Sequence, residues 1–209
     1  MSLKTSRRLS RKFFVRPTLE VARNLIGKYL VYRPGRQEMV VRLVEVEAYI
    51  GEDDPACHAA VGKTARNEVM YGIGGHGYIY FIYGMYHCLN VVTEGEGVPA
   101  AVLIRGAEPV AGIESMRRNY EKAGGGKLTD GPGKLCRALG LTRQQNGLDL
   151  VNSRLFLEDR GYRPKRLERS SRIGIKKGRD KEWRFFESDA AYVSSRPAKT
   201  SLKSINRSL

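Results

Sequence analysis

Two glutamates and a tyrosine alternate with small apolar residues between positions 44 and 50, in the order Val-Glu-Val-Glu-Ala-Tyr-Ile. Because successive side chains of a β-strand point to opposite faces, Glu45, Glu47 and Tyr49 share one face. A carboxylate that faces a pocket can act as a general base on water or stabilise positive charge developing in a sugar. The alternative interpretation is a pair of exposed acids on a half-solvated strand.

A polar loop follows this segment and reads Asp53-Asp54-Pro55-Ala56-Cys57-His58. Histidine and aspartate side chains that lie close together can bind a metal or donate hydrogen bonds to a heterocycle. The same pattern is typical of a polar loop with one satisfied histidine. The chain holds only 3 histidines, which excludes a histidine-rich metal site.

Residues 78–86 are rich in tyrosine, and alternation places Tyr78 and Tyr80 on one face of a strand. Aromatic rings beside a basic surface can stack on bases or wedge between base steps, although an aromatic core strand gives the same pattern. Tyr83 precedes a glycine turn and is best placed to protrude. Asn90 and Arg105 interrupt apolar strand segments, and each needs a partner or a ligand if it is buried.

The charge of the chain favours an anionic partner. Lys and Arg number 37 against 22 Asp and Glu, giving a net charge of +15 and a pI near 9.9. Residues 1–36 hold ten basic side chains against one acid, and residues 163–184 hold ten against three, whereas residues 38–58 hold six acids against one arginine. Basic flanks around an acidic centre are expected of an enzyme that binds phosphates and uses carboxylates for chemistry.

The elements that must position these residues are short, and antiparallel strands dominate. The pattern predicts helices over residues 18–26 and 111–122, a helix starting within 131–139, and strands over 29–33, 39–50, 78–83, 87–93, 100–105, 155–157 and 183–186. Thr18 is expected to cap the first helix. We predict an α+β fold, mainly antiparallel, with a basic flexible arm over 1–12, one domain over 13–194 and a polar basic tail, expected to be disordered, over 195–209.

The cellular compartment of the protein is predicted from features that its sequence lacks. It has no signal-peptide pattern at its start, no apolar run of membrane-spanning length and only 3 scattered cysteines. We therefore expect an intracellular protein with reduced thiols and no membrane partner.

Taken together, the motifs resemble the alkyladenine (3-methyladenine) DNA glycosylase family, also called methylpurine DNA glycosylases. The matching segments occur in family order: 25–27, 45–51, His58, 64–67, 78–90, 105–109 and 131–136, with a thinner continuation at 172–175. The resemblance implies a curved, open-barrel-like antiparallel sheet, like the C-terminal domain of formyltransferases, flanked by short helices. It also implies a DNA repair enzyme that flips a damaged purine out of the duplex and hydrolyses its bond to the sugar.

The resemblance assigns roles residue by residue. Glu47 matches the general base that activates water, and Arg105 matches a residue near that water and the DNA backbone. The remaining matches are to residues of the base-binding pocket (Tyr49, His58, Tyr80, Asn90) and to a residue that intercalates into the minor groove (Tyr83). His87 departs from the family, where this position is often aromatic.

The family also implies a monofunctional enzyme that leaves an abasic site, without cofactor or metal. It would act as a monomer on double-stranded DNA containing damaged purines, in the cytoplasm or nucleoid of a bacterium or the nucleus of a eukaryote. Two alternatives remain open at this point. One is a metal-dependent nuclease that uses Glu45, Glu47, Asp53 and Asp54, and the other is a non-catalytic nucleic-acid-binding domain.

Overall fold

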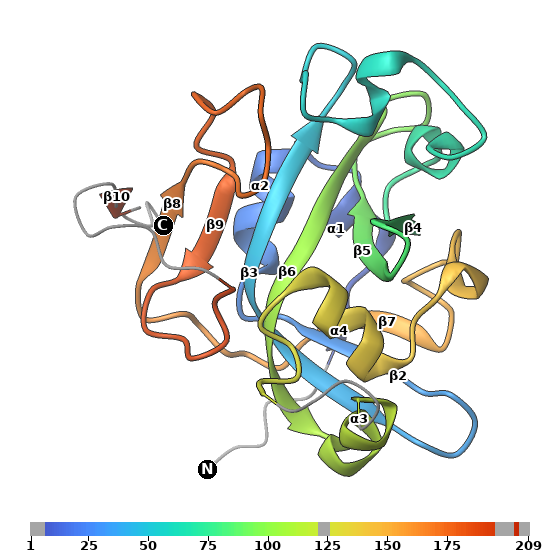
Figure 1. The fold of residues 1–209 in the computed structure, drawn as a ribbon, viewed down its shortest axis with the longest axis vertical. Coiled ribbons are helices and arrows are strands. Elements are labelled where there is room, and N and C mark those ends of the chain that lie inside the picture. Colours follow the sequence, from blue (N-terminus) through green and yellow to red (C-terminus); the bar gives the residue numbers. More distant parts are fainter. Residues whose placement is uncertain (1–6, 121–125, 195–202, 205–209) are drawn as a thin grey trace.

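A curved antiparallel sheet organises the molecule, as the computed structural model shows (Figure 1). The structure describes residues 7–120 and 126–194, together with the backbone of residues 203–204. Strands β3 (Met39–Ile50) and β6 (Ala100–Ala111) are the longest and pair along their length at the centre of the sheet. The sheet order is β1-β7-β2-β3-β6-β5-β4, and β9 pairs with β3 and β8 beside this path.

The remaining strands are shorter and also pair in antiparallel fashion. They are β1 (Arg7–Arg8), β2 (Tyr29–Tyr32), β4 (Gly77–Ile82), β5 (Tyr86–Val92), β7 (Leu155–Asp159), β8 (Leu167–Ser170), β9 (Arg184–Glu187) and β10 (Lys203–Ser204). The predicted α+β class and the curved, mainly antiparallel sheet are confirmed. Strand β8 was not predicted, because its sequence Leu-Glu-Arg-Ser carries two charges and little β propensity.

Short helices pack around the sheet. They are α1 (Arg11–Phe14), α2 (Thr18–Leu25), α3 (Ile113–Tyr120), α4 (Pro132–Leu139) and the 3-10 turns η1 (His58–Val61), η2 (Glu68–Tyr71) and η4 (Arg143–Gln145). The prediction that Thr18 caps a helix is wrong: Pro17 occupies the N-cap, and the Thr18 hydroxyl instead donates to Glu94 Oε1 at 2.5 Å. Among the described residues, no helix is long and apolar enough to span a membrane.

The basic arm predicted over residues 1–12 is described only from Arg7 onward. Arg7 and Arg8 pair with the end of β7, and Leu9 N–H donates to the carbonyl of Leu157 at 2.8 Å. Arg7 and Arg8 thus form β1, and Arg11 and Lys12 begin α1, while the flexibility expected of the arm stays a prediction. Residues 1–6 and most of the predicted tail over 195–209 lie outside the described residues.

Strand β3 is buried on both of its faces between positions 39 and 48. Val46 and Ala48 belong to the main core, whereas Val44 packs with Phe186 in a second cluster. The register of β3 against β6 shifts on either side of Glu45, where β3 also pairs with β9. Gly106, opposite Glu45, leaves room for this crowding, since a Cβ there would lie 2.4 Å from the carbonyl oxygen of Tyr192. The paired glutamates therefore lie inside the molecule, in the middle of the sheet.

Candidate active site

A cavity of about 370 Å³ opens between the β4–β5 hairpin, the loop after β3 and the segment after β8. Seven residues singled out in the sequence contribute to its wall: Tyr49, His58, Tyr78, Tyr80, Tyr83, Asn90 and Arg105. Pro132 at the start of α4 and residues 173–175 line it as well. Residues as far apart in sequence as Tyr49 and Ile175 therefore line one cavity.

Glu47 lies beneath this cavity with no exposed surface, so the alternative of exposed acids is excluded. Its Oε2 accepts hydrogen bonds from the Tyr49 hydroxyl at 2.9 Å and from Arg105 Nη1 at 3.2 Å, and its Oε1 accepts from the backbone N–H of Ile173 at 2.7 Å. Burial raises the pKa of Glu47, while Arg105, the Ile173 amide and Tyr49 act in the opposite direction. The carboxylate is thus held by three donors and made more basic by its surroundings.

Glu45 is equally buried and forms a second layer behind Glu47. Its oxygens accept from Arg184 Nε at 2.7 Å, from Arg105 Nε at 3.3 Å, and from the N–H and hydroxyl of Ser194 at 2.5 and 2.9 Å. Arg105 therefore bridges the two glutamates. Neither glutamate lines the cavity; Glu47 contacts the lining residues Tyr49, Arg105 and Ile173, whereas Glu45 contacts Arg105 alone among these three.

The cavity walls are planar rings held at fixed angles. His58 and Tyr80 meet edge to face with centroids 4.4 Å apart, and His58 Nδ1 lies 2.9 Å from the Tyr78 hydroxyl. Burial, with the nearby charge of Arg66, lowers the pKa of His58 to about 4. The imidazole is therefore neutral near pH 7, and this part of the wall presents the flat, uncharged rings of His58 and Tyr80 to a ligand.

Asn90 contributes a polar group to this wall. It lies on β5 directly across from Tyr78 of β4, and its Nδ2 donates to the Tyr78 carbonyl at 3.1 Å. Only 4% of its surface is exposed. Its amide is thus fixed in orientation.

The tip of the β4–β5 hairpin projects outward from the cavity rim. Tyr83 and Gly84 have φ values of 54° and 66°, and Met85 N–H donates to the Ile82 carbonyl at 3.2 Å, the pattern that a type I′ turn requires. Tyr83 is 79% exposed and Met85 58%. Phe81, on the strand that leads into the turn, is 43% exposed.

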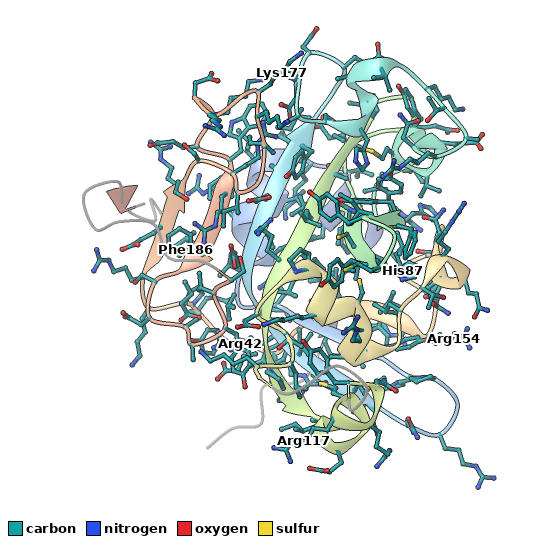
Figure 2. All side chains as sticks on the ribbon, in the orientation of Figure 1. Arg42, His87, Arg117, Arg154, Lys177 and Phe186 are labelled. Carbon is teal, nitrogen blue, oxygen red and sulfur yellow. The ribbon has the colours of Figure 1, made fainter. Side chains whose placement is uncertain are left out.

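The base of the same hairpin is supported by its neighbours. Figure 2 shows His87 on β5, where its ring lies 4.9 Å from the ring of Phe81. Tyr86 packs against α4, and a Cβ at Gly133 would come within 2.7 Å of its ring. The residues that follow the exposed turn are therefore packed against Phe81 and α4.

The four acids of the alternative nuclease site do not form one group. Asp53 is exposed, whereas Asp54 is buried and paired with Arg172 at 2.5 Å. Glu45 and Glu47 are instead bound by arginine donors. Over residues 7–120 and 126–194, no group of three or more His, Cys, Asp or Glu side chains could hold a metal ion.

Three residues near Glu47 were not assigned a role from the sequence: Arg172, Ile173 and Arg184. The first two belong to the segment 172–175, where the family resemblance is thin. Arg184 could have been found by the reasoning applied to Arg105, because it is a charge flanked by Trp183 and Phe185.

Comparison with known proteins identifies the family to which the chain belongs. A sequence model of the family described as methylpurine-DNA glycosylase (MPG) matches residues 12–191. A protein of Methanocella arvoryzae is 50% identical over 193 residues, covering 90% of this chain and 96% of that protein. Proteins of Alkaliphilus oremlandii (44% over 200 residues, 90% and 98% covered) and of a Wolbachia species (49% over 177 residues, 85% and 95% covered) are also similar.

All three relatives carry the name "Putative 3-methyladenine DNA glycosylase". The resemblance predicted from the motifs is confirmed, since both the family match and the relatives extend over most of the chain. The chain belongs to the methylpurine-DNA glycosylase family and is a DNA-repair glycosylase.

Proposed function

We propose that this enzyme flips a damaged purine out of duplex DNA into the cavity and hydrolyses its N-glycosidic bond, with Glu47 as general base. The observation that carries the proposal is the fully buried Glu47 carboxylate beneath a cavity walled by aromatic rings. The names of the relatives support an alkylated purine as the substrate base.

The energetics of base extrusion are compatible with this cavity. Moving a nucleotide out of the stack costs a few kcal/mol, least where damage has already weakened pairing. Stacking on aromatic side chains contributes about 1–3 kcal/mol per base, and Tyr49, His58 and Tyr80 supply such rings. An alkylated purine is cationic, which electron-rich rings favour over normal bases. Asn90 would exclude guanine by a steric clash with its exocyclic amino group.

The hydrolysis requires one water and one base. Water oxygen attacks the anomeric carbon, the carbon–nitrogen bond breaks, and its electron pair leaves with the purine. The water proton passes to Glu47, whose raised pKa makes it a better acceptor. The carboxylate also stabilises the oxocarbenium-like sugar, while Arg105 keeps the carboxylate in position. No strand break belongs to this reaction, so the product is an abasic site.

The surface around the cavity is suited to DNA. Tyr83, exposed on its turn, would occupy the space left by the extruded nucleotide in the minor groove. The excess of positive charge would neutralise phosphates and make binding depend on salt. We infer a monomer acting on duplex DNA inside the cell, where that substrate is found.

Single-turnover excision tests the proposal. Duplexes that carry one hypoxanthine, one ethenoadenine or one methylated purine are incubated with wild type or with Glu47→Gln, in the presence of EDTA. We expect base release by the wild type, strand breaks only after alkali, and a loss of about 10²–10⁴-fold or more in the variant.

The other outcomes identify the alternatives. Strand scission that EDTA abolishes would indicate a metal-dependent nuclease. Tight binding of duplexes with no released base, and no effect of Glu47→Gln, would indicate a binding domain.

A further inference from the structure

The segment between β8 and β9, residues 171–183, leaves the sheet and returns to it beside Glu47. Its first part carries Ile173, whose N–H contacts Glu47, and the cavity-lining residues up to Ile175. Its last residue, Trp183, accepts a hydrogen bond from the N–H of Ala48 at 2.8 Å. Arg172 Nη1 donates to the carbonyl of the same Ala48 at 3.0 Å. Both ends of the segment are therefore anchored on the residue between Glu47 and Tyr49.

Arg172 also forms an ion pair with Asp54 in which neither side chain is exposed. Nη1 and Nη2 reach Oδ2 and Oδ1 at 2.5 and 2.7 Å, a bidentate arrangement that fixes both planes. Burial alone would raise the pKa of Asp54, but the Arg172 hydrogen bonds lower it below its ordinary value. The pair is thus ionised and joins the segment 171–183 to the loop after β3.

The same guanidinium lies against the ring of Tyr49, with Cζ 4.7 Å from the ring centroid. Tyr49 lines the cavity, whereas Arg172 does not, so the contact supports the ring from outside the cavity wall. Asp54 in turn accepts from the N–H of Ala56, another lining residue, and its carbonyl accepts from Cys57 N–H. One ion pair therefore contacts two residues of the wall, Tyr49 and Ala56.

We infer that Arg172, fixed by Asp54, is a positioning residue of the active site: it holds the Tyr49 ring and the Ile173 amide against Glu47. The inference rests on the proposed role of Glu47 as the base. Arg172 does not touch the cavity, so it acts through those two donors.

Displacing Arg172 changes the proton affinity of Glu47 in a predictable direction. The Ile173 N–H and the Tyr49 hydroxyl both donate to the carboxylate and favour its ionised form. When they move away, the pKa of Glu47 rises and the base is protonated at a higher pH. The charged and titratable groups that face Glu47 are Arg105 of β6, Glu45 and Tyr49 of β3, Tyr80 of β4 and Arg172 itself.

The test uses Arg172→Lys in the full chain, because lysine keeps the charge but cannot form the bidentate pair. We expect the single-turnover excision rate at neutral pH to fall about tenfold to a hundredfold, since misplacement by an ångström has this effect. The acid limb of the pH–rate profile moves to higher pH. Affinity for a duplex carrying a tetrahydrofuran abasic-site analogue stays within about threefold of wild type, because the DNA-binding surface is unchanged.

Arg42→Lys is the matched control. Arg42 is also a buried arginine of the sheet. Its Nη1 donates to Glu187 Oε2 at 2.5 Å, and its Cζ lies 4.0 Å from the centroid of the Tyr162 ring. It lies far from the segment that contains Lys177 (Figure 2). We expect Arg42→Lys to lower the melting temperature and leave the pH–rate profile unchanged.

A second variant and a second signal keep the test decisive if Arg172→Lys does not fold. Asp54→Asn preserves the shape of the partner and removes its charge, and should shift the same acid limb by a smaller amount. Trp183 is the single tryptophan of the chain and lies 5.1 Å from the Arg172 guanidinium. Its fluorescence therefore reports whether the Arg172 guanidinium has left its place beside Asp54.

Three outcomes would count against the inference. Wild-type rate and pH profile in both Arg172→Lys and Asp54→Asn would overturn it while leaving the proposed function intact. An equal shift in Arg42→Lys would show a general effect of lost stability and overturn it as well. Absence of base release by the wild type would overturn the proposed function itself, and the inference with it.

Discussion

Two regions of the molecule place side chains where most proteins do not: the region behind the cavity buries charged residues, and the tip of the β4–β5 hairpin exposes apolar ones. Behind the cavity lie buried carboxylates and arginines, which most proteins keep at the surface: Glu45, Glu47, Asp54, Arg105, Arg172 and Arg184. At the hairpin tip lie apolar side chains that most proteins bury: Phe81, Tyr83 and Met85. The two regions meet at the rim of one cavity, to which Tyr83 and Arg105 both contribute.

Both regions lower the stability of the folded state. A buried ion carries a desolvation penalty of several kcal/mol, which pairing only partly offsets. Each exposed large apolar side chain forgoes about 1.5–3 kcal/mol that burial would contribute. Rigidity and affinity are therefore separated here: the buried charges fix the geometry of the proposed base Glu47, whereas the exposed side chains of the hairpin tip are available to a partner surface.

The largest effect on stability is expected from Arg184→Ala, which breaks the buried region. Arg184 Nε contacts Glu45 at 2.7 Å with both side chains almost fully buried. Without it, Glu45 loses a buried arginine partner and keeps Arg105 and Ser194, and we expect the free energy of unfolding to fall by about 3–5 kcal/mol. Urea denaturation measures this loss. Arg36→Ala, at an exposed position, should change stability by no more than about 0.5 kcal/mol, and equal losses in the two variants would contradict the comparison.

A smaller, pH-dependent effect is expected at His58, which lies in the wall between the two regions. Burial and Arg66 lower its pKa to about 4, so the unfolded chain binds a proton more readily than the native protein between this value and the ordinary 6.5. The contribution of His58 to stability is complete above pH 6.5 and is lost as the pH falls toward 4. Unfolding measured from pH 7.5 to 4 should show a loss of about 2 kcal/mol more in wild type than in His58→Asn. Parallel curves for the two proteins would refute the assignment.

The smallest effect is expected from Tyr83→Asn, which changes only the exposed region. Asparagine tolerates the positive φ of this turn, so stability should stay within about 0.5 kcal/mol of wild type. Affinity for a duplex with an abasic-site analogue should fall about tenfold, because a stacking ring is worth about 1–3 kcal/mol. Binding titrations at fixed salt measure this change, with Val110→Thr as an exposed apolar control. A large loss of stability in Tyr83→Asn would show that the tip also supports the fold.

The sequence predicted those parts of the site whose signals are local. The alternation of residues 44–50 predicted β3, and the tyrosine run with its glycine predicted the β4–β5 hairpin and the exposure of Tyr83. The ion pairs behind the cavity could not be predicted in this way, because Asp54 and Arg172 are separated by 118 positions and Glu45 and Arg184 by 139. A residue that acts through such a pair has no local pattern, and its partner is known only once the sheet is closed.

The contact between Glu47 and the Ile173 amide can form only late in the synthesis of the chain. The glutamate leaves the ribosome early, but its donor follows 126 residues later and Ser194, which binds Glu45, follows that glutamate by 149. At about 5–20 residues per second, the two acids wait several seconds for these partners. A nascent chain that ends before Ile173 therefore carries the proposed base Glu47 without the Ile173 amide that donates to it.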